Sequence, residues 1–233
     1  MMLNCPAARC PFRSFASGEI LSKLPAGTCD LSDSVKVLLI GGTSHVGKST
    51  FAIRLAEQLG WNHLSADQLA RNPGRPWRRD ETDLPDDVIT HYSSLTTTEL
   101  VDAVLRHYKQ NVWPIIDAIV RSHVNNPYDP CLIFEGSAIL PELVVTSQFE
   151  QTSSVWLTAA DDLITERILD DSQFDRRADG EKQLIDAFLA RTLAFNEMLM
   201  ESVNQLAQQS LDVNVTDTFD ALVSACGGSG SLN

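Results

Sequence analysis

The most informative chemistry in this sequence lies in residues 41–50, which read GGTSHVGKST between an apolar stretch and a helical pattern. G-x-x-x-x-G-K-[ST] in that setting is a phosphate-binding P-loop, whose backbone amides and following helix N-terminus attract an anion. We expect Lys48 to reach the β- and γ-phosphates and to act in catalysis, and Ser49 to bind Mg²⁺. Thr50 is the alternative hydroxyl for the metal, and His45 is interpreted as a spacer at the loop tip. The predicted nucleotide-binding residues are Gly42, Thr43, Ser44, His45, Val46, Gly47, Lys48, Ser49 and Thr50.

Two acidic residues follow strand-like segments. Asp67 comes after residues 62–65, and Glu135 comes directly after the apolar run 132–134. Ligand sites lie at the carboxyl ends of parallel strands, so Asp67 can accept the proton of a substrate hydroxyl or hold Mg²⁺ through water. The structural alternative is a cap for a helix that begins at Gln68. Glu135 has the position of an acid that fixes Mg²⁺ or its waters, and a salt bridge or a substrate contact is the other interpretation.

A basic loop follows the second of these segments. Arg75, Arg78 and Arg79 fall within seven residues of a chain whose net charge is −13. Arginine binds anions through paired hydrogen bonds, so Arg75 and Arg78 are candidate substrate residues and an anionic acceptor is one expectation. The alternative is a solvated loop in which the arginines pair with Asp80, Glu81 and Asp83.

More arginines lie in a helical region nearer the C-terminus. Arg176 and Arg177 are our candidates for stabilising charge on a transferred phosphoryl group, as an arginine finger does. Arg167 and Arg191 are further candidates in the same region. The rival interpretation is ordinary surface pairing with Asp170, Asp171 and Asp175.

These residues are positioned by strand and helix patterns that alternate along the chain, which predicts an α/β fold with a parallel sheet covered on both faces. A helix is expected at 48–59, directly after the P-loop. The five expected strands are residues 35–40, 62–65, 131–134, 154–158 and 211–215. Five strands with the P-loop on the first match a P-loop NTPase core of the kinase-like type.

We expect one P-loop domain over residues 35–226. Residues 71–128 are an insertion on the acceptor side, loop-like up to residue 96 and then a structural helical pair at 97–123. Residues 161–191 have the helix, charged loop and helix of a lid over phosphates. Residues 1–34 are predicted to be a disordered tail, with a miscalled start or a transit-type segment as alternatives, and 227–233 a flexible end.

The composition limits the partners. With 31 acidic against 18 basic residues, the chain lacks the basic surplus of nucleic-acid-binding proteins, and we expect none of that class as partner. No apolar run approaches the roughly 20 residues of a membrane span. The five cysteines match no zinc spacing. A cytoplasmic, reduced protein that acts on a small molecule is therefore expected.

The chain resembles the P-loop small-molecule kinases of the nucleoside-monophosphate-kinase type, and within them the group of 2-phosphoglycerate kinases and AAA-type ATPases. The resemblance rests on the 41–50 loop, on IFEG at 133–136, and on WLT at 156–158 leading to Glu166 and Arg167. Asp67 is also similar to the catalytic aspartate of chloramphenicol phosphotransferase and zeta-toxin-like kinases. The resemblance implies ATP, Mg²⁺ and phosphoryl transfer to a hydroxyl. The alternative function is a nucleotide-binding regulatory ATPase without a small-molecule acceptor.

Overall fold

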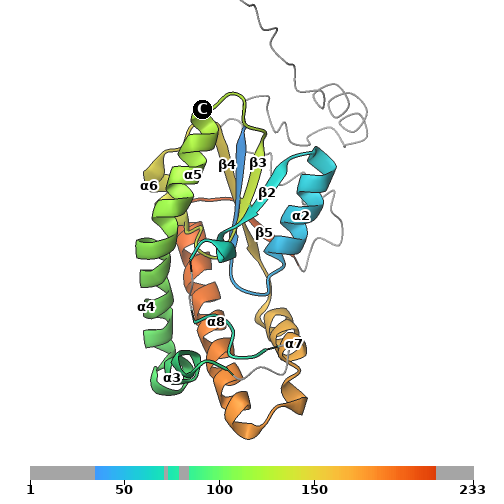
Figure 1. The fold of residues 1–233 in the computed structure, drawn as a ribbon, viewed down its shortest axis with the longest axis vertical. Helices are drawn as coiled ribbons and strands as arrows, with labels where there is room; N and C mark the ends of the chain where they lie inside the picture. The colour runs from blue at the N-terminus through green and yellow to red at the C-terminus, as the bar shows by residue number, and fades with distance from the viewer. Residues whose placement is uncertain (1–34, 71–72, 79–83, 214–233) are drawn as a thin grey trace, which may run out of the picture.

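The structure, a computed structural model, describes residues 35–70, 73–78 and 84–213, and its centre is one sheet (Figure 1). All neighbouring strands are parallel, in the order β2-β3-β1-β4-β5. This arrangement confirms the predicted α/β class and five-stranded parallel sheet. Strand β1 is central, so the loop that follows it lies at the middle of the sheet's carboxyl edge, where such folds bind ligands. The strands are β1 Val37–Gly42, β2 Asn62–Ser65, β3 Leu132–Glu135, β4 Thr152–Thr158 and β5 Ser210–Asp212.

Helices cover both faces of the sheet. Successive side chains of β1 point to opposite faces, so they belong to two different hydrophobic cores. Leu38 and Ile40 belong to one core, and Val37 and Leu39 belong to the other. All six residues of β1 are buried, as expected for a strand packed on both faces. The first core includes side chains from α2 (Lys48–Leu59) and α7 (Asp161–Ser172). The second includes side chains from α5 (Trp113–Asn125) and α6 (Pro141–Ser147), and α8 (Asp179–Gln205) contributes to both.

The insertion after β2 contains a helix where the sequence predicts loop. Helix α3 (Asp86–Ser94) buries only Val88 and Tyr92, and its other positions are largely polar, so the helical period is weak in the sequence. The Tyr92 hydroxyl donates to the carbonyl oxygen of Gly74 at 2.6 Å. The prediction of loop through residue 96 is therefore wrong for α3, because tertiary packing rather than local pattern stabilises this helix.

The next two helices form one long column rather than a hairpin (Figure 1). Helix α4 (Thr97–His107) begins with a capping box made by Thr96 and Glu99. The π-helical segment Tyr108–Val112 then joins α4 directly to α5. Helical structure at 97–123 is thus present, and the π segment turns Tyr108 and Val112 toward the cavity described below.

The 161–191 region consists of α7, the short turn Phe174–Arg176 and the start of α8. Figure 1 shows α7 and the first turns of α8 beyond the carboxyl ends of the strands. This is a suitable place for a lid, and its movement stays a prediction. Of the helices that the structure describes, none combines the length and apolarity needed to cross a membrane.

Candidate active site

The P-loop connects β1 to α2 with backbone angles that need glycine. Gly42 has a φ of +139° and Gly47 a φ of +103°, and a Cβ on Gly42 would lie 2.7 Å from the carbonyl oxygen of Leu157. His45 also has a positive φ, +63°, at the tip of the loop. No side chain caps α2 at Gly47, so its first amides are left to bind an anion.

Lys48 lies inside the loop that it follows. Its Nζ donates to the carbonyl oxygen of Thr43 at 2.7 Å, and its side chain is buried. Burial lowers the pKa of Lys48, and the negative charges of Glu135 and Asp67 oppose that shift. The Thr43 hydroxyl donates to the carbonyl oxygen of Thr192 at 3.3 Å, which attaches the loop to α8.

Ser49 and Glu135 meet across the sheet edge. The Ser49 hydroxyl donates to Glu135 Oε1 at 3.1 Å, and His63 Nε2 lies 3.9 Å from the same oxygen. Glu135 is only 1% exposed, and its Oε2 is buried without a hydrogen-bond partner among the described residues. A buried, half-satisfied carboxylate next to a hydroxyl fits Mg²⁺, which takes few protein oxygens and completes its shell with phosphate and water. The described part of the chain contains no group of three or more His, Cys, Asp or Glu side chains that could hold a metal ion.

Asp67 lies in the turn that follows β2. The short helix Ala66–Gln68 is capped by Ser65, whose hydroxyl accepts from the Asp67 amide at 3.4 Å. The cap is therefore Ser65 and not Asp67, which leaves the Asp67 carboxylate exposed to the cavity that the P-loop also lines. Gly136, directly after β3, packs closely against this turn, since a Cβ there would lie 2.4 Å from the Ala66 Cβ.

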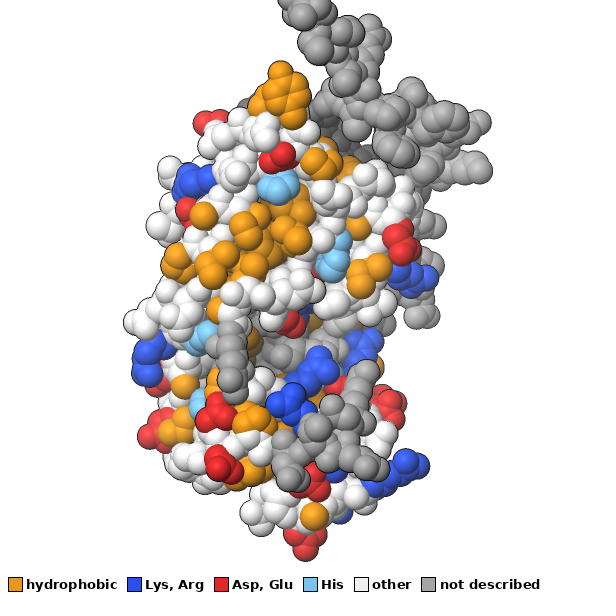
Figure 2. Space-filling view, in the orientation of Figure 1, with side chains coloured by type: hydrophobic (Ala, Val, Ile, Leu, Met, Phe, Trp, Pro, Cys, Tyr) orange, Lys and Arg blue, Asp and Glu red, His pale blue; other side chains and the backbone are white. Residues whose placement is uncertain are grey.

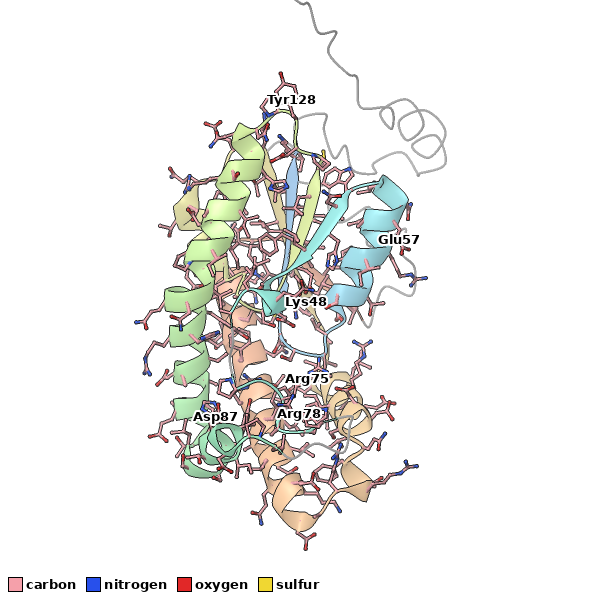
Figure 3. The ribbon with its side chains drawn as sticks, viewed as in Figure 1. Lys48, Glu57, Arg75, Arg78, Asp87 and Tyr128 are labelled. Carbon is pink, nitrogen blue, oxygen red and sulfur yellow. The ribbon has the colours of Figure 1, made fainter. Side chains whose placement is uncertain are left out.

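One cavity of about 970 Å³ is lined by the P-loop, Ser49 and Asp67, a size suited to a nucleotide and a small second ligand. Glu135 is not part of its wall and contacts it through Ser49. Figure 2 shows Lys and Arg side chains gathered beside the hollow below the sheet. In Figure 3 Lys48 lies at the end of the sheet, with Arg75 between it and Arg78 in this view. The charged and polar lining includes Ser44, His45, Lys48, Ser49, Thr50, Arg54, Asp67, Arg75, His107, Tyr108, Ser137, Arg167, Asp171 and Arg191.

The basic loop contributes one of its two described arginines to the cavity. Arg75 lines it, and its Nη1 lies 2.8 Å from Asp171 Oδ2. Arg78 is exposed and does not line the cavity; its carbonyl oxygen accepts from Arg177 Nη2 at 2.8 Å. Arg79 and its expected acidic partners lie outside the described residues.

The arginines of the 161–191 region that line the cavity are not the two that the sequence analysis favoured. Arg176 and Arg177 do not line the cavity, and Arg177 is engaged with Glu181 and with the Ser172 carbonyl oxygen. Arg167 and Arg191 do line it. Arg167 Nη1 donates to the carbonyl oxygens of His45 and Val46 at 3.0 and 3.1 Å. Its place on a helix directly after the strand next to β1 is the sequence signal that favours Arg167.

Sequence reasoning missed the role of Asp171 as a shared acceptor. Its Oδ2 lies 3.3 Å from His45 Nε2 and accepts from Trp77 Nε1 at 3.3 Å, in addition to its pairing with Arg75. The carboxylate thus links the lid region, the P-loop tip and the 73–78 segment. Burial, followed by the charge of Arg75, lowers the pKa of His45 to about 4, while Asp171 acts in the opposite direction.

Comparison with known proteins finds solved structures that are similar only at low identity and with TM-scores below 0.5. No protein-family model matches the chain, and no curated protein matches it. A gluconokinase from Sinorhizobium meliloti 1021 is 15% identical with a TM-score of 0.44, over 82% of this chain and 90% of that one. A shikimate kinase from Bacteroides thetaiotaomicron is 14% identical with a TM-score of 0.41, over 81% and 93%. A sugar kinase from Janibacter sp. HTCC2649 is 17% identical with a TM-score of 0.43, over 81% and 90%. Likeness at this level assigns no activity, which has to be argued from the site itself.

Proposed function

We propose that this protein is a kinase that moves the γ-phosphoryl group of ATP to a hydroxyl of a small metabolite with the help of Mg²⁺. The observation that supports this most strongly is that Asp67 and the P-loop line the same cavity. A carboxylate at the carboxyl edge of the sheet, beside a phosphate site, is what an acceptor hydroxyl needs to lose its proton.

The donor side of the cavity is built from residues that bind phosphate oxygens. The loop amides and Lys48 would hold the β- and γ-phosphates, and Lys48 would exchange its bond to Thr43 for a phosphate oxygen. Arg75 lines the cavity as Lys48 does, and its charge would offset negative charge on the γ-phosphoryl group. Ser49 and Glu135 would hold Mg²⁺, which when bound supplies positive charge to the phosphates.

The acceptor side would use Asp67 as general base. Its carboxylate takes the proton from the acceptor hydroxyl as that oxygen bonds to the γ-phosphorus. The bond between the γ-phosphorus and the bridging oxygen breaks, and ADP leaves with the electron pair. The Ala66–Gln68 turn, packed on Gly136, holds Asp67 in position for this step. The 161–191 region would close over the reacting groups, and Arg176 and Arg177 could reach the phosphates only through such a movement.

The test is ATP consumption against a library of small hydroxy compounds, with labelled products identified for each active compound. Asp67→Asn should retain ATP affinity and lose about 10²- to 10⁴-fold in transfer. Asp102→Asn is the matched control, because Asp102 is exposed on α4 and does not line the cavity. Unchanged transfer in Asp67→Asn would remove Asp67 as the base. Tight ATP binding by the wild-type chain without transfer to any compound would favour the regulatory ATPase instead.

A further inference from the structure

Arg191 on α8 is a buried cation without an acidic partner among the described residues. It is 7% exposed, and its Nε is buried with no hydrogen-bond partner. Its guanidinium lies over the ring of Phe188, with Cζ 4.6 Å from the centroid, and Nη2 has one long contact of 3.4 Å with the Thr192 hydroxyl. Burial of a charge with so little compensation is unfavourable, and it is relieved when an anion supplies the missing acceptors.

The cavity is where such an anion could lie, because Arg191 is part of its wall. Tyr108 shows which part of the wall this is. Burial raises the pKa of Tyr108 to about 12, and the charges of both Arg191 and Asp67 act on it in opposite directions. The Tyr108 ring also packs on Phe195, one turn along α8 from Arg191, with centroids 6.0 Å apart, and Tyr108, Arg191 and Asp67 line the same cavity.

The arginines that act on the P-loop are others. Arg75 is the arginine that perturbs Lys48, and Arg167 is the one that donates to the loop carbonyls. The charge of Arg191 instead acts on groups of the insertion, His91 and Tyr92 on α3 as well as Tyr108. In the packing, Arg191 stacks on Phe188, whose ring lies against Tyr92 of the insertion with centroids 6.0 Å apart, so Arg191 lies beside the acceptor-side insertion.

We infer that Arg191 binds an oxyanion of the acceptor, a carboxylate or a phosphate, while Asp67 faces the hydroxyl that is phosphorylated. The acceptor class is then a small hydroxy acid or a phosphorylated hydroxy compound. This inference rests on the proposed function for the role of Asp67. The oxyanion site itself is a binding property that can be measured without turnover.

The experiment measures equilibrium binding of matched compounds to the full chain saturated with ADP and Mg²⁺. Glycerate and glycerol 3-phosphate are each compared with glycerol, and gluconate is compared with sorbitol, so that each pair differs by one oxyanion. Comparing glycerate with glycerol 3-phosphate also distinguishes a carboxylate site from a phosphate site. We expect at least one anion to bind about ten- to a hundredfold more tightly than its neutral counterpart, as for charge-assisted hydrogen bonds. Arg191→Gln should abolish that difference, Arg191→Lys should restore part of it, and both should bind ADP as the wild type does.

Arg106→Gln is the control, since Arg106 is exposed on α4 and does not line the cavity. Urea unfolding of each variant shows whether the fold is retained. The inference is overturned if no anion is preferred by the wild type at millimolar concentration, or if the preference survives in Arg191→Gln. It is also overturned if Arg191→Gln weakens ADP binding instead, because Arg191 would then serve the donor phosphates. Anion preference that depends on Arg191, without phosphoryl transfer to any compound, would support the oxyanion site and contradict the proposed kinase activity.

Discussion

Replacing Gly136 by alanine should displace the candidate base without touching the nucleotide site. An added Cβ would lie 2.4 Å from the Ala66 Cβ, whereas ordinary contacts begin at 3.4 Å. The turn that precedes Asp67 would therefore have to move by about 1 Å, or β3 would have to yield by the same amount. A misplacement of that size at a reacting group costs roughly a hundredfold in rate, and overpacking costs about 1–3 kcal/mol of unfolding free energy.

Three measurements separate these effects. Urea unfolding reports the loss of stability, titration with a fluorescent ATP analogue reports the P-loop, and transfer to the acceptor found in the library screen reports the position of Asp67. We expect Gly136→Ala to bind the analogue within about twofold of wild type and to lose about ten- to a hundredfold in transfer. Gly180→Ala is the matched control, because a Cβ at Gly180 meets nothing within 4 Å.

A compensating variant makes the test specific. In the double variant Gly136→Ala/Ala66→Gly, the methyl group is removed from residue 66 and added at residue 136, so the clash is relieved. Part of the lost stability and part of the lost transfer rate should therefore return. If Gly136→Ala is as stable and as active as wild type, the packing of Gly136 on Ala66 does not hold Asp67. Equal loss of nucleotide affinity and transfer would show that the damage is general.

Two further predictions concern the P-loop and its neighbours. His45 is neutral in the fold, with a pKa of about 4 against an ordinary 6.5, so its contribution to stability is complete above pH 6.5 and is lost as the pH falls toward 4. The control is His45→Asn, because asparagine tolerates the positive φ. Between about pH 7 and about pH 5, the unfolding free energy measured in urea should fall by about 1.5–2 kcal/mol more for wild type than for this variant. Equal losses of unfolding free energy would contradict the assignment of a neutral, buried His45. Glu135→Gln should reduce the Mg²⁺ affinity of the ATP complex by about ten- to a hundredfold, measured by Mg²⁺ titration with ATP bound, and an unchanged titration curve would exclude Glu135 from the metal site.

The sequence was sufficient for those parts of the fold and site that depend on local pattern. The P-loop residues 42–49 are adjacent in the chain, and the buried runs of β1 and β3 are continuous enough to read as parallel strands. The pairing of β2 with β3 then places Ser65 opposite Glu135, which brings the end of β2 and Asp67 to the same edge.

The parts that were missed depend on contacts between distant segments. Helix α3 buries two side chains and is stabilised by packing on α8, so its local pattern is weak. Asp171 collects donors from residues about a hundred positions away, and no spacing in the sequence shows that. Among four arginines in the 161–191 region, Arg167 and Arg191 line the cavity and the other two do not, and for Arg191 only the tertiary structure shows this.

The most direct test of the central proposal follows the phosphoryl group itself. ATP labelled with heavy oxygen on the γ-phosphoryl group is incubated with wild-type protein, Mg²⁺ and the acceptor from the screen, and the products are analysed by mass spectrometry. The proposed function predicts that the labelled phosphoryl group appears on the acceptor hydroxyl and that Asp67→Asn strongly reduces this product. Label found only in inorganic phosphate would contradict it, since ATP would then be hydrolysed and not used to phosphorylate a metabolite.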